Sequence, residues 1–375
     1  MVKKLTLFLF FILVLCFINS NALKAYPRFA AYTGSKCMDC HINPDGGSMR
    51  QGYGIKYAKD ELNMEMFKKI AGKMEFSPKI NKYISLGGDV RVAQIDDEVP
   101  DKSNFNTFLT MQGDLDVNVK LNEILNVFVT SGIQIPNFPT KYEAYGMLSK
   151  LPLDAYFLAG RFRPAYGIRI VEHRAYQRLY LLNTPYDADA GFELGFSPCD
   201  LNFNVGLFNG VNTDFFDQDA HKMFTANADY TFHIKDNVHI NLGTSVFNNP
   251  YKYAFLNNTF VRKSAAGFIK IGLFDRVAIL GEADFTENRD SVLTRTFFGF
   301  GELNVRLIKG VELRAQYEYM QPNRDMSNND RSRYSVGAAF FPFFGFESEL
   351  MARFTKEHPV EIQDNEWQWS FHFYF

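Results

Sequence analysis

Apolar and polar side chains alternate along the chain from about residue 80 to the last residue. In residues 238–246, VHINLGTSV, the apolar side chains fall on even positions and the odd positions carry polar or small ones. The same alternation recurs in residues 111–121, 226–234, 313–320 and 346–354. A period of two predicts strands with one polar and one apolar face.

The alternation predicts about 16 strands joined by connections of two lengths. After the second, eighth and twelfth segments the chain turns within two or three residues, whereas IDDEVPDKS, FNGVNTDFFDQDA and TKEHPVEIQDNE follow odd-numbered segments. Short periplasmic turns and long external loops produce this asymmetry in bacterial outer-membrane barrels, which have an even number of strands. The segments lie near residues 83–95, 105–120, 124–135, 141–149, 152–162, 190–197, 201–208, 222–233, 237–247, 260–273, 276–288, 293–307, 311–322, 331–342, 345–355 and 367–375.

Charged side chains in the middle of these segments favour a barrel in lipid over a soluble β-sandwich, which would show the same period. Such charges would be costly in a sealed core, whereas a water-filled lumen accommodates them. They are Glu282, Asp284, Glu302, Arg306, Arg314, Glu318, Glu347, Glu349 and Arg353.

The C-terminus, WQWSFHFYF, places five aromatic side chains on one face and ends on Phe375. It looks like the terminal strand that outer-membrane barrels present for insertion. In a soluble protein the same aromatic edge would promote aggregation. The net charge of −2, with both signs interspersed, leaves no basic stripe for nucleic acid. We therefore expect a mainly β fold over residues 79–375: a transmembrane antiparallel β-barrel of about 16 strands, in contact with the lipid of the cell outer membrane.

The first 22 residues read as a secretory signal peptide. Lys3 and Lys4 precede an apolar run from Leu5 to Ile18, and Ser20-Asn21-Ala22 follows. About 14 apolar residues are short for a transmembrane anchor. A lipoprotein anchor at Cys16 is disfavoured, because Leu15 stands where a small residue is needed.

Residues 23–78 are expected to form a small, mainly helical module, with a helix between Met49 and Met74. They contain CMDCH, residues 37–41. Cys-x-x-Cys-His is the attachment signature of haem c, because two thiols bind the haem edge and the adjacent imidazole binds the iron. A zinc site would need further ligands, and a thiol-disulfide exchange motif would need alternating strands and helices. We predict one covalent haem c on Cys37 and Cys40, with His41 as the iron ligand.

The sixth iron ligand is left open by the sequence. Methionine ligation is available from residues close in sequence, although methionines at helical spacing more often pack than bind metal. Two histidines flank a predicted periplasmic turn and could also bind the iron. The simpler interpretation is that these histidines lie on the polar face of their strands, in contact with water. The candidates are Met49, Met64, Met66, Met74, His233 and His239. Cys199 is interpreted as an unpaired thiol.

Two groups of charged residues lie on predicted long connections. The segment after the fifth strand carries five arginines, which either fold into the lumen as a constriction that pairs with haem propionates or selects anions, or lie on a solvated external loop. Acidic clusters on external loops either attract Fe²⁺ or only solvate the surface. The residues are Arg161, Arg163, Arg169, Arg174 and Arg178, and the clusters 96–98, 214–219 and 361–366.

The stretch AYPRFAAYTGSKCMDCHINPDGGSMRQGYG resembles the amino-terminal module of the fused monohaem cytochrome c–porins of outer membranes, whose best-known members are extracellular iron oxidases. The shared residues are Pro27, Phe29, Ala30, Thr33, Gly34, Cys37, Cys40, His41, Pro44, Gly52 and Tyr53. The segment Asp45-Gly46-Gly47 departs from the more hydrophobic continuation of that family. The resemblance implies that the haem sits inside or against the barrel.

Together these features predict an outer-membrane electron transfer protein. It would carry electrons through its haem between an extracellular donor or acceptor, Fe(II) being the leading candidate, and a periplasmic c-type cytochrome. Such a role requires no general base or nucleophile. The alternatives are a porin-like channel with a haem-containing plug or sensor, and a barrel sheath around a separate multihaem cytochrome.

Overall fold

The structure is a computed structural model that describes residues 27–47, 49–73, 76–98, 105–132, 142–170, 174–181, 188–210, 217, 219–252, 259–290, 292–359 and 362–375. The expected signal peptide and Met74 lie outside these residues. Within the described part of the chain, no helix is long and apolar enough to cross a membrane.

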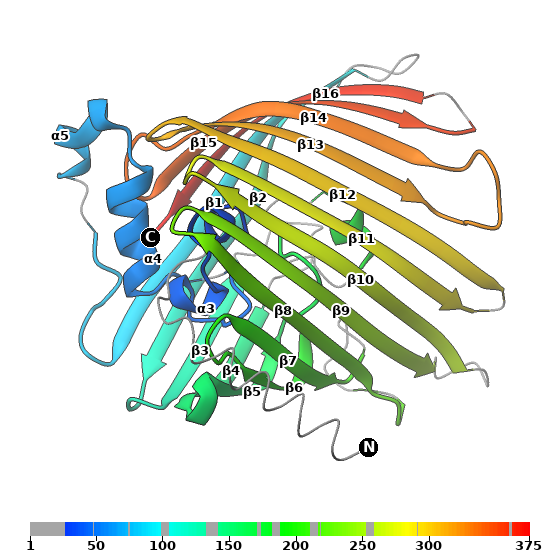
Figure 1. Cartoon of the computed structure of the whole chain (residues 1–375), viewed down its shortest axis with the longest axis horizontal. Helices are drawn as coiled ribbons and strands as arrows, with labels where there is room; N and C mark the ends of the chain where they lie inside the picture. Colours follow the sequence, from blue (N-terminus) through cyan, green and yellow to red (C-terminus); the bar gives the residue numbers. More distant parts are fainter. Residues whose placement is uncertain are drawn as a thin grey trace.

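Sixteen antiparallel strands form one closed barrel, in which each strand pairs with its neighbours in sequence and β1 pairs with β16 (Figure 1). The predicted fold class is confirmed. The strands are β1 (Ile84–Glu98), β2 (Phe105–Lys120), β3 (Leu125–Gly132), β4 (Tyr142–Leu151), β5 (Ala155–Phe162), β6 (Asp189–Phe196), β7 (Leu201–Phe208), β8 (Met223–Lys235), β9 (Val238–Lys252), β10 (Thr259–Leu273), β11 (Val277–Arg289), β12 (Leu293–Ile308), β13 (Val311–Gln321), β14 (Arg331–Phe340), β15 (Phe346–Glu357) and β16 (Ile362–Tyr374).

The last strand begins earlier than its aromatic pattern indicates. It was expected from residue 367, but β16 starts at Ile362, which is paired with Glu357 of β15. Its pairing with β1 also reaches back to Asn365. The ladder hydrogen bonds to two neighbours therefore extend the strand into polar sequence, because strand pairing does not require apolar side chains.

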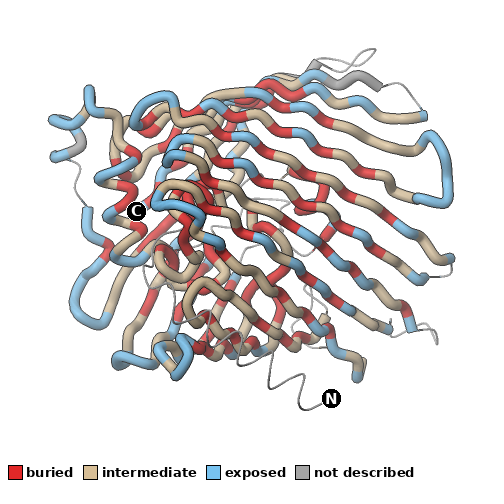
Figure 2. The backbone as a smooth tube through the Cα atoms, in the orientation of Figure 1, coloured by how far each residue is buried: buried red, intermediate tan, exposed pale blue. Residues whose placement is uncertain are grey.

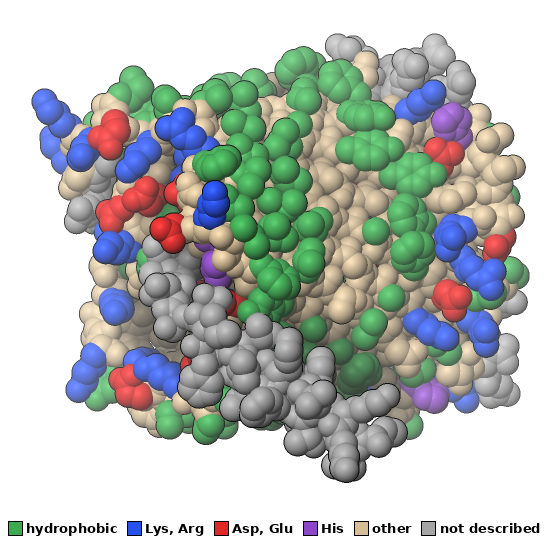
Figure 3. All heavy atoms as spheres, viewed as in Figure 1, with side chains coloured by type: hydrophobic (Ala, Val, Ile, Leu, Met, Phe, Trp, Pro, Cys, Tyr) green, Lys and Arg blue, Asp and Glu red, His purple; other side chains and the backbone are tan. Residues whose placement is uncertain are grey.

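Buried and exposed residues alternate along the strands (Figure 2). On the outer face, large apolar side chains gather over the strands (Figure 3). Leu303, Leu313 and Trp369 are among these exposed residues. Most of the mid-strand charges point inward and are buried, as predicted, and Arg314 pairs with Glu302 at 3.0 Å. The polar face thus lines the lumen and the apolar face meets lipid.

The N-terminal segment, residues 27–47 and 49–73, forms short helices. These are α2 (Pro27–Thr33), α3 (Cys37–Cys40), α4 (Gly52–Tyr57), the π-helix η1 (Ala58–Leu62), the 3₁₀-helix η2 (Glu65–Phe67) and α5 (Lys68–Ala71). The single helix expected from Met49 to Met74 is wrong. The chain is extended at Asn63 and Met64, since the Met64 N–H donates to the Phe341 carbonyl in the turn between β14 and β15.

Helix α2 lies inside the barrel against β9, β10 and β11. Gly272 of β10 makes this approach possible, because a Cβ there would overlap the carbonyl of Ala31. From the same helix, Arg28 reaches Glu312 of β13 at 3.2 Å and Glu347 of β15 at 3.0 Å. One apolar cluster includes Phe29 and Phe341. The N-terminal segment and the barrel wall therefore share a core.

Candidate haem cavity in the barrel lumen

The Cys-x-x-Cys-His motif forms one helical turn inside the barrel. Helix α3 begins at Cys37 and ends at Cys40. The His41 N–H donates to the Cys37 carbonyl at 3.0 Å. His41 itself is extended and forms a bridge with Arg50, which holds the motif between two chain segments. The His41 side chain is buried, and the described cysteines form no disulfide.

A tight turn follows the motif. The Asn43 side chain accepts a hydrogen bond from the Asp45 N–H at 3.0 Å, and Gly46 and Gly47 have φ values of +86° and +75°. A Cβ at Gly46 would lie 3.3 Å from the Cys37 Sγ, and one at Gly47 would lie 2.7 Å from Arg163. Glycine is needed at both positions for backbone conformation and for space. These two glycines therefore shape the turn beside Cys37.

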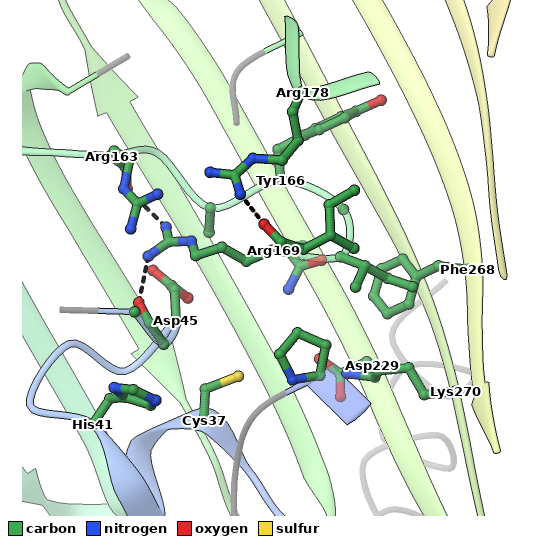
Figure 4. A pocket seen from close by; sticks show the side chains of 18 of the residues that line it. Cys37, His41, Asp45, Arg163, Tyr166, Arg169, Arg178, Asp229, Phe268 and Lys270 are labelled. Atoms are coloured by element: carbon green, nitrogen blue, oxygen red, sulfur yellow. Dashed lines mark hydrogen bonds between the residues drawn. The ribbon is translucent and has the colours of Figure 1, made fainter. Parts of the chain in front are cut away.

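Cys37 and His41 line a cavity of about 1130 Å³, open solvent included (Figure 4). The wall combines apolar surface with an excess of basic side chains. Its apolar residues include Pro27, Ala165, Ile168, Ile170 and Phe268; its basic residues are Arg50, Arg91, Arg163, Arg169, Arg178 and Lys270; its acidic residues are Asp45, Asp89 and Asp229.

The arginine-rich segment after β5 crosses the lumen in its described parts, residues 163–170 and 174–181. The Tyr166 hydroxyl donates to Asp284 of β11 at 2.9 Å, and the Ile168 N–H donates to Glu282 at 2.6 Å. Farther along, the Tyr176 N–H donates to Glu318 of β13 at 2.9 Å, at the start of helix α6 (Tyr176–Tyr180). Of the two interpretations of this segment, the structure supports the luminal constriction.

Arg163 and Arg169 connect this constriction to the turn after the motif. Arg169 donates to the Gly46 carbonyl at 2.7 Å and to the Arg163 carbonyl at 3.3 Å, as Figure 4 shows. Arg163 pairs with the buried Glu143 of β4 at 3.4 Å. Of the other predicted arginines, Arg178 lines the cavity, whereas Arg174 pairs with Glu366. Arg161 is part of β5.

Burial changes the acid–base properties of two groups at the cavity. It raises the pKa of the Cys37 thiol to about 11. It also raises the pKa of the Asp45 carboxyl above its ordinary value, with nearby Arg169 acting in the opposite direction. One Asp45 oxygen accepts a hydrogen bond from Asn204 of β7 at 3.0 Å. Both side chains are thus shifted toward their neutral forms.

Cys40 occupies a different environment from Cys37. It is 1% exposed and packs against Gly54, where a Cβ would lie 2.9 Å from the Cys40 Cβ. Among the described cavity-lining residues, only one of the two motif thiols is present. The thiol of Cys37 and the imidazole of His41 face the cavity together, and Cys40 lies one helical turn behind.

The proposed sixth ligands are spread over several places. Met49 packs in an apolar cluster with Phe128 and Tyr145, Met64 lies against Gly310, and Met66 is 80% exposed. His233 and His239 flank the β8–β9 turn as expected, with their Nδ1 atoms 2.9 Å apart and the His233 Nε2 3.1 Å from Asp200. They lie against Gly34. None of these residues is among the described residues that line the cavity.

The acidic clusters are only partly described. Asp217 pairs with Lys222, and Glu366 pairs with Arg174 and Arg353, whereas residues 214–216, 218 and 361 lie outside the described part of the chain. No group of three or more His, Cys, Asp or Glu side chains forms a metal site among the residues described. Residues 96–98 belong to β1 and residues 362–366 to β16, so their expected position on external loops is wrong, because the two strands pair with each other there. Fe²⁺ binding by the acidic clusters stays a prediction.

Several residues of the site are not predicted from the sequence. Arg50, Asp45 and Lys270 line the cavity, and Arg28 anchors α2. Arg28 had a local signal, since it is a single charge in the apolar stretch YPRFAAY. Lys270 had none, because its alternation pattern shows only that it belongs to a strand.

The cavity fits a haem in its chemical character, except that the second attachment thiol, Cys40, is buried and is not among its described lining residues. A haem needs an apolar, shape-filling wall for its ring, basic groups for its two carboxylates and a histidine for its iron. Pro27, Ile168 and Phe268 provide apolar wall for the ring. The arginines and Lys270 provide basic groups for the carboxylates, and His41 provides a ligand for the iron.

Comparisons with known proteins identify the barrel alone. No family profile matches the sequence, and no curated protein matches it. Three similar solved structures are an anion-selective porin from Comamonas acidovorans (TM-score 0.60, 11% identity, 78% of this chain and 99% of that one), OmpF of Salmonella typhi in complex with daunomycin (0.58, 12%, 78% and 97%) and the outer-membrane channel DcaP of Acinetobacter baumannii (0.54, 11%, 78% and 97%). The closed barrel and its apolar outer face are the form in which β-strands span an outer membrane. The chain is an outer-membrane β-barrel with a porin-like fold.

Proposed function

We propose that this chain is an outer-membrane electron transfer protein with one haem c, attached through Cys37 and Cys40 and ligated by His41, inside a porin-like barrel. Electrons would pass between an extracellular donor or acceptor and a periplasmic c-type cytochrome. Fe(II) is the leading candidate for the extracellular substrate.

One observation carries the proposal: Cys37 and His41 line the same cavity inside the barrel. The motif by itself predicts attachment only. Its position explains why a haem would be joined to a barrel. The membrane with its headgroups is about 40 Å thick, so that a haem in the periplasm would lie far from an external substrate. A luminal site shortens that path.

The chain's own side chains prepare this cavity for a group with two carboxylates. Six basic residues face three acidic ones across its wall, and Arg163 and Arg169 are already held in place by Glu143 and the Gly46 carbonyl. Preorganised guanidinium groups bind carboxylates with little further ordering. When bound, the haem would supply a one-electron Fe(III)/Fe(II) couple.

The first test is covalent attachment. The protein would be produced in a host with c-type cytochrome maturation, and bound haem would be measured on denaturing gels and by intact mass. Wild type and Cys199→Ala should retain one haem, whereas Cys37→Ala/Cys40→Ala should retain none. Haem loss from the wild type on denaturation would overturn the proposal.

The second test addresses function. Purified oxidised protein in liposomes would be mixed in a stopped-flow spectrometer with Fe²⁺ added only outside. Rapid haem reduction supports Fe(II) oxidation. If the haem stays oxidised with Fe²⁺ but is reduced by a periplasmic-type reductant, the Fe(II) assignment is wrong and outward electron transfer is favoured.

A porin-like channel with a haem-containing plug is the second candidate, and the porin fold of the barrel favours it. Against free diffusion, the N-terminal segment fills part of the lumen, with Arg28 in ion pairs to Glu312 and Glu347. Planar-bilayer recordings separate the two candidates. Steady ion conductance by the wild type would favour the channel, and a closed pore would favour the electron transfer protein.

A further inference from the structure

A lysine-rich segment connects the N-terminal helices to β1. Residues 65–83 contain five lysines and two glutamates, in a chain whose net charge is −2. Lys68, Lys69, Lys73, Lys79 and Lys82 are all exposed. Lys68 is 3.5 Å from Glu65, a solvent-exposed pair, and Lys69, Lys79 and Lys82 form no ion pair with the described carboxylates. We call residues 65–73 and 76–83 the basic collar.

The basic collar also exposes large apolar side chains. The exposed fractions are 80% for Met66, 50% for Ile70, 42% for Phe76, 61% for Ile80 and 50% for Tyr83. Apolar groups that alternate with lysines are typical of segments that lie in a membrane interface, where lysine amines stay at headgroup level. In water, an exposed patch of this kind would promote association.

Contacts with the C-terminal strand place the collar at the membrane rim. The ring of Phe76 packs edge-on against the ring of Phe375, with centroids 5.3 Å apart. Phe375 continues the outward-facing aromatic row of β16, which includes Trp369 and Phe373, 47% and 50% exposed. Phe76 is therefore continuous with the lipid-facing surface, at the end of the barrel that carries the short turns.

Part of the collar has a defined backbone. The Asn81 side chain accepts hydrogen bonds from the N–H groups of Tyr83 and Ile84, and the Pro78 carbonyl accepts one from the Leu86 N–H. The Lys82 amine lies 4.7 Å from the centroid of the Tyr83 ring. Lys79, Ile80 and Lys82 are thus presented from an ordered turn next to β1.

We infer that the basic collar binds anionic phospholipid headgroups of the periplasmic leaflet, with Phe76 and Ile80 entering the interface beside Phe375. Burial of apolar side chains and attraction of lysines to anionic lipid both contribute to the free energy of membrane binding. This lipid site is independent of the haem. A soluble acidic protein is the other possible occupant, but the Phe76–Phe375 contact favours lipid.

Lipid selectivity tests the inference directly. Detergent-purified protein would be mixed with phosphatidylglycerol or phosphatidylcholine and analysed by native mass spectrometry. The wild type should retain phosphatidylglycerol about tenfold better. Lys69→Glu/Lys79→Glu/Lys82→Glu should lose that preference. The control Lys252→Glu/Lys263→Glu/Lys356→Glu changes the charge equally at the opposite rim and should keep it. Absence of preference in the wild type, or equal loss in both variants, would overturn the inference.

Photo-crosslinking tests the apolar half of the site. A benzoyl-phenylalanine at position 80 should form a phospholipid adduct in nanodiscs, whereas the same group at Met326, 58% exposed between β13 and β14, should not. If position 80 forms no adduct, Ile80 does not enter the lipid interface and the inference is wrong. Because neither assay needs haem, failure here is distinguishable from failure of the proposed function.

Discussion

The guanidinium of Arg28 lies 3.0 Å from the carboxylate of Glu347, although the two residues are 319 positions apart in sequence. Arg28 also pairs with Glu312, and all three side chains are largely buried. The first described helix is thereby joined to β13 and β15, which lie near the C-terminal end of the sequence. This contact makes the N-terminal segment part of the folded barrel.

Replacing Arg28 with Gln should destabilise the protein by about 3 kcal/mol, because two buried carboxylates would each lose a partner, although Arg306 still pairs with Glu312 and His372 still lies against Glu347. Denaturant unfolding in detergent micelles measures the loss. Arg331→Gln is the matched control, since Arg331 pairs with Glu357 at 3.6 Å while 37% exposed. That exposed pair should contribute less than about 1 kcal/mol. Equal effects of the two substitutions would contradict a buried anchor.

Gly272→Ala should displace helix α2 from the barrel wall, because the new Cβ would overlap the Ala31 carbonyl. Trypsin cleavage after Arg28 should become faster, and bilayer conductance should rise. Gly267→Ala in the same strand meets nothing within 4 Å and should leave both unchanged. If Gly272→Ala behaves like that control, the close helix–wall contact is wrong.

Alanine at Gly46 or Gly47 should destabilise the turn after the motif. Both positions have positive φ, which costs a residue with a side chain about 1–3 kcal/mol. Gly52→Ala is the control, since nothing lies within 4 Å of a Cβ there and its φ is helical. Unfolding free energies of the three variants, with haem content measured alongside, test the expectation. A neutral Gly46→Ala would show that the turn has another conformation.

In protein prepared without haem, Cys37 should react slowly with iodoacetamide at pH 7. Burial raises the pKa of its thiol from 9.0 to about 11, so the reactive thiolate is about a hundredfold scarcer than for an ordinary cysteine. The alkylation rate should rise about tenfold per pH unit between pH 7 and 10, without levelling off. Peptide mass spectrometry reads the rate at each pH. A plateau below pH 9 would show that the thiol is not buried.

Much of the barrel could be predicted because its signal is local. The period of two fixes which side chains of β11 and β12 face the lumen, and Glu282 and Glu302 point inward as expected. The ends of the short helices in the N-terminal segment are harder to predict. Residues 49–74 have helical composition, yet the tertiary hydrogen bond from Met64 to Phe341 breaks the helix. No local pattern encodes that contact.

The candidate site divides in the same way. Cys37, Cys40 and His41 are recognisable from their spacing, and the arginines near residue 169 from their number. Their arrangement around one cavity depends on contacts between distant strands. Arg169 reaches Gly46 across 123 positions, and Gly272 matters only because Ala31 approaches it. Such relationships arise from closure of the barrel.

The position of His41 inside the closed barrel also constrains the order of assembly. Strands β1 and β16 close the barrel, and the buried His372 of β16 bonds to Asp89 of β1 at 2.6 Å beside the Arg28–Glu347 pair. An enzyme that modifies Cys37 and Cys40 needs access to both thiols, which a finished barrel denies. On the proposed assignment, attachment of the haem would therefore come before the last strand closes, while the chain is still unfolded in the periplasm. The biogenesis of this protein would then have an obligatory sequence: export, cofactor attachment, and only afterwards membrane insertion.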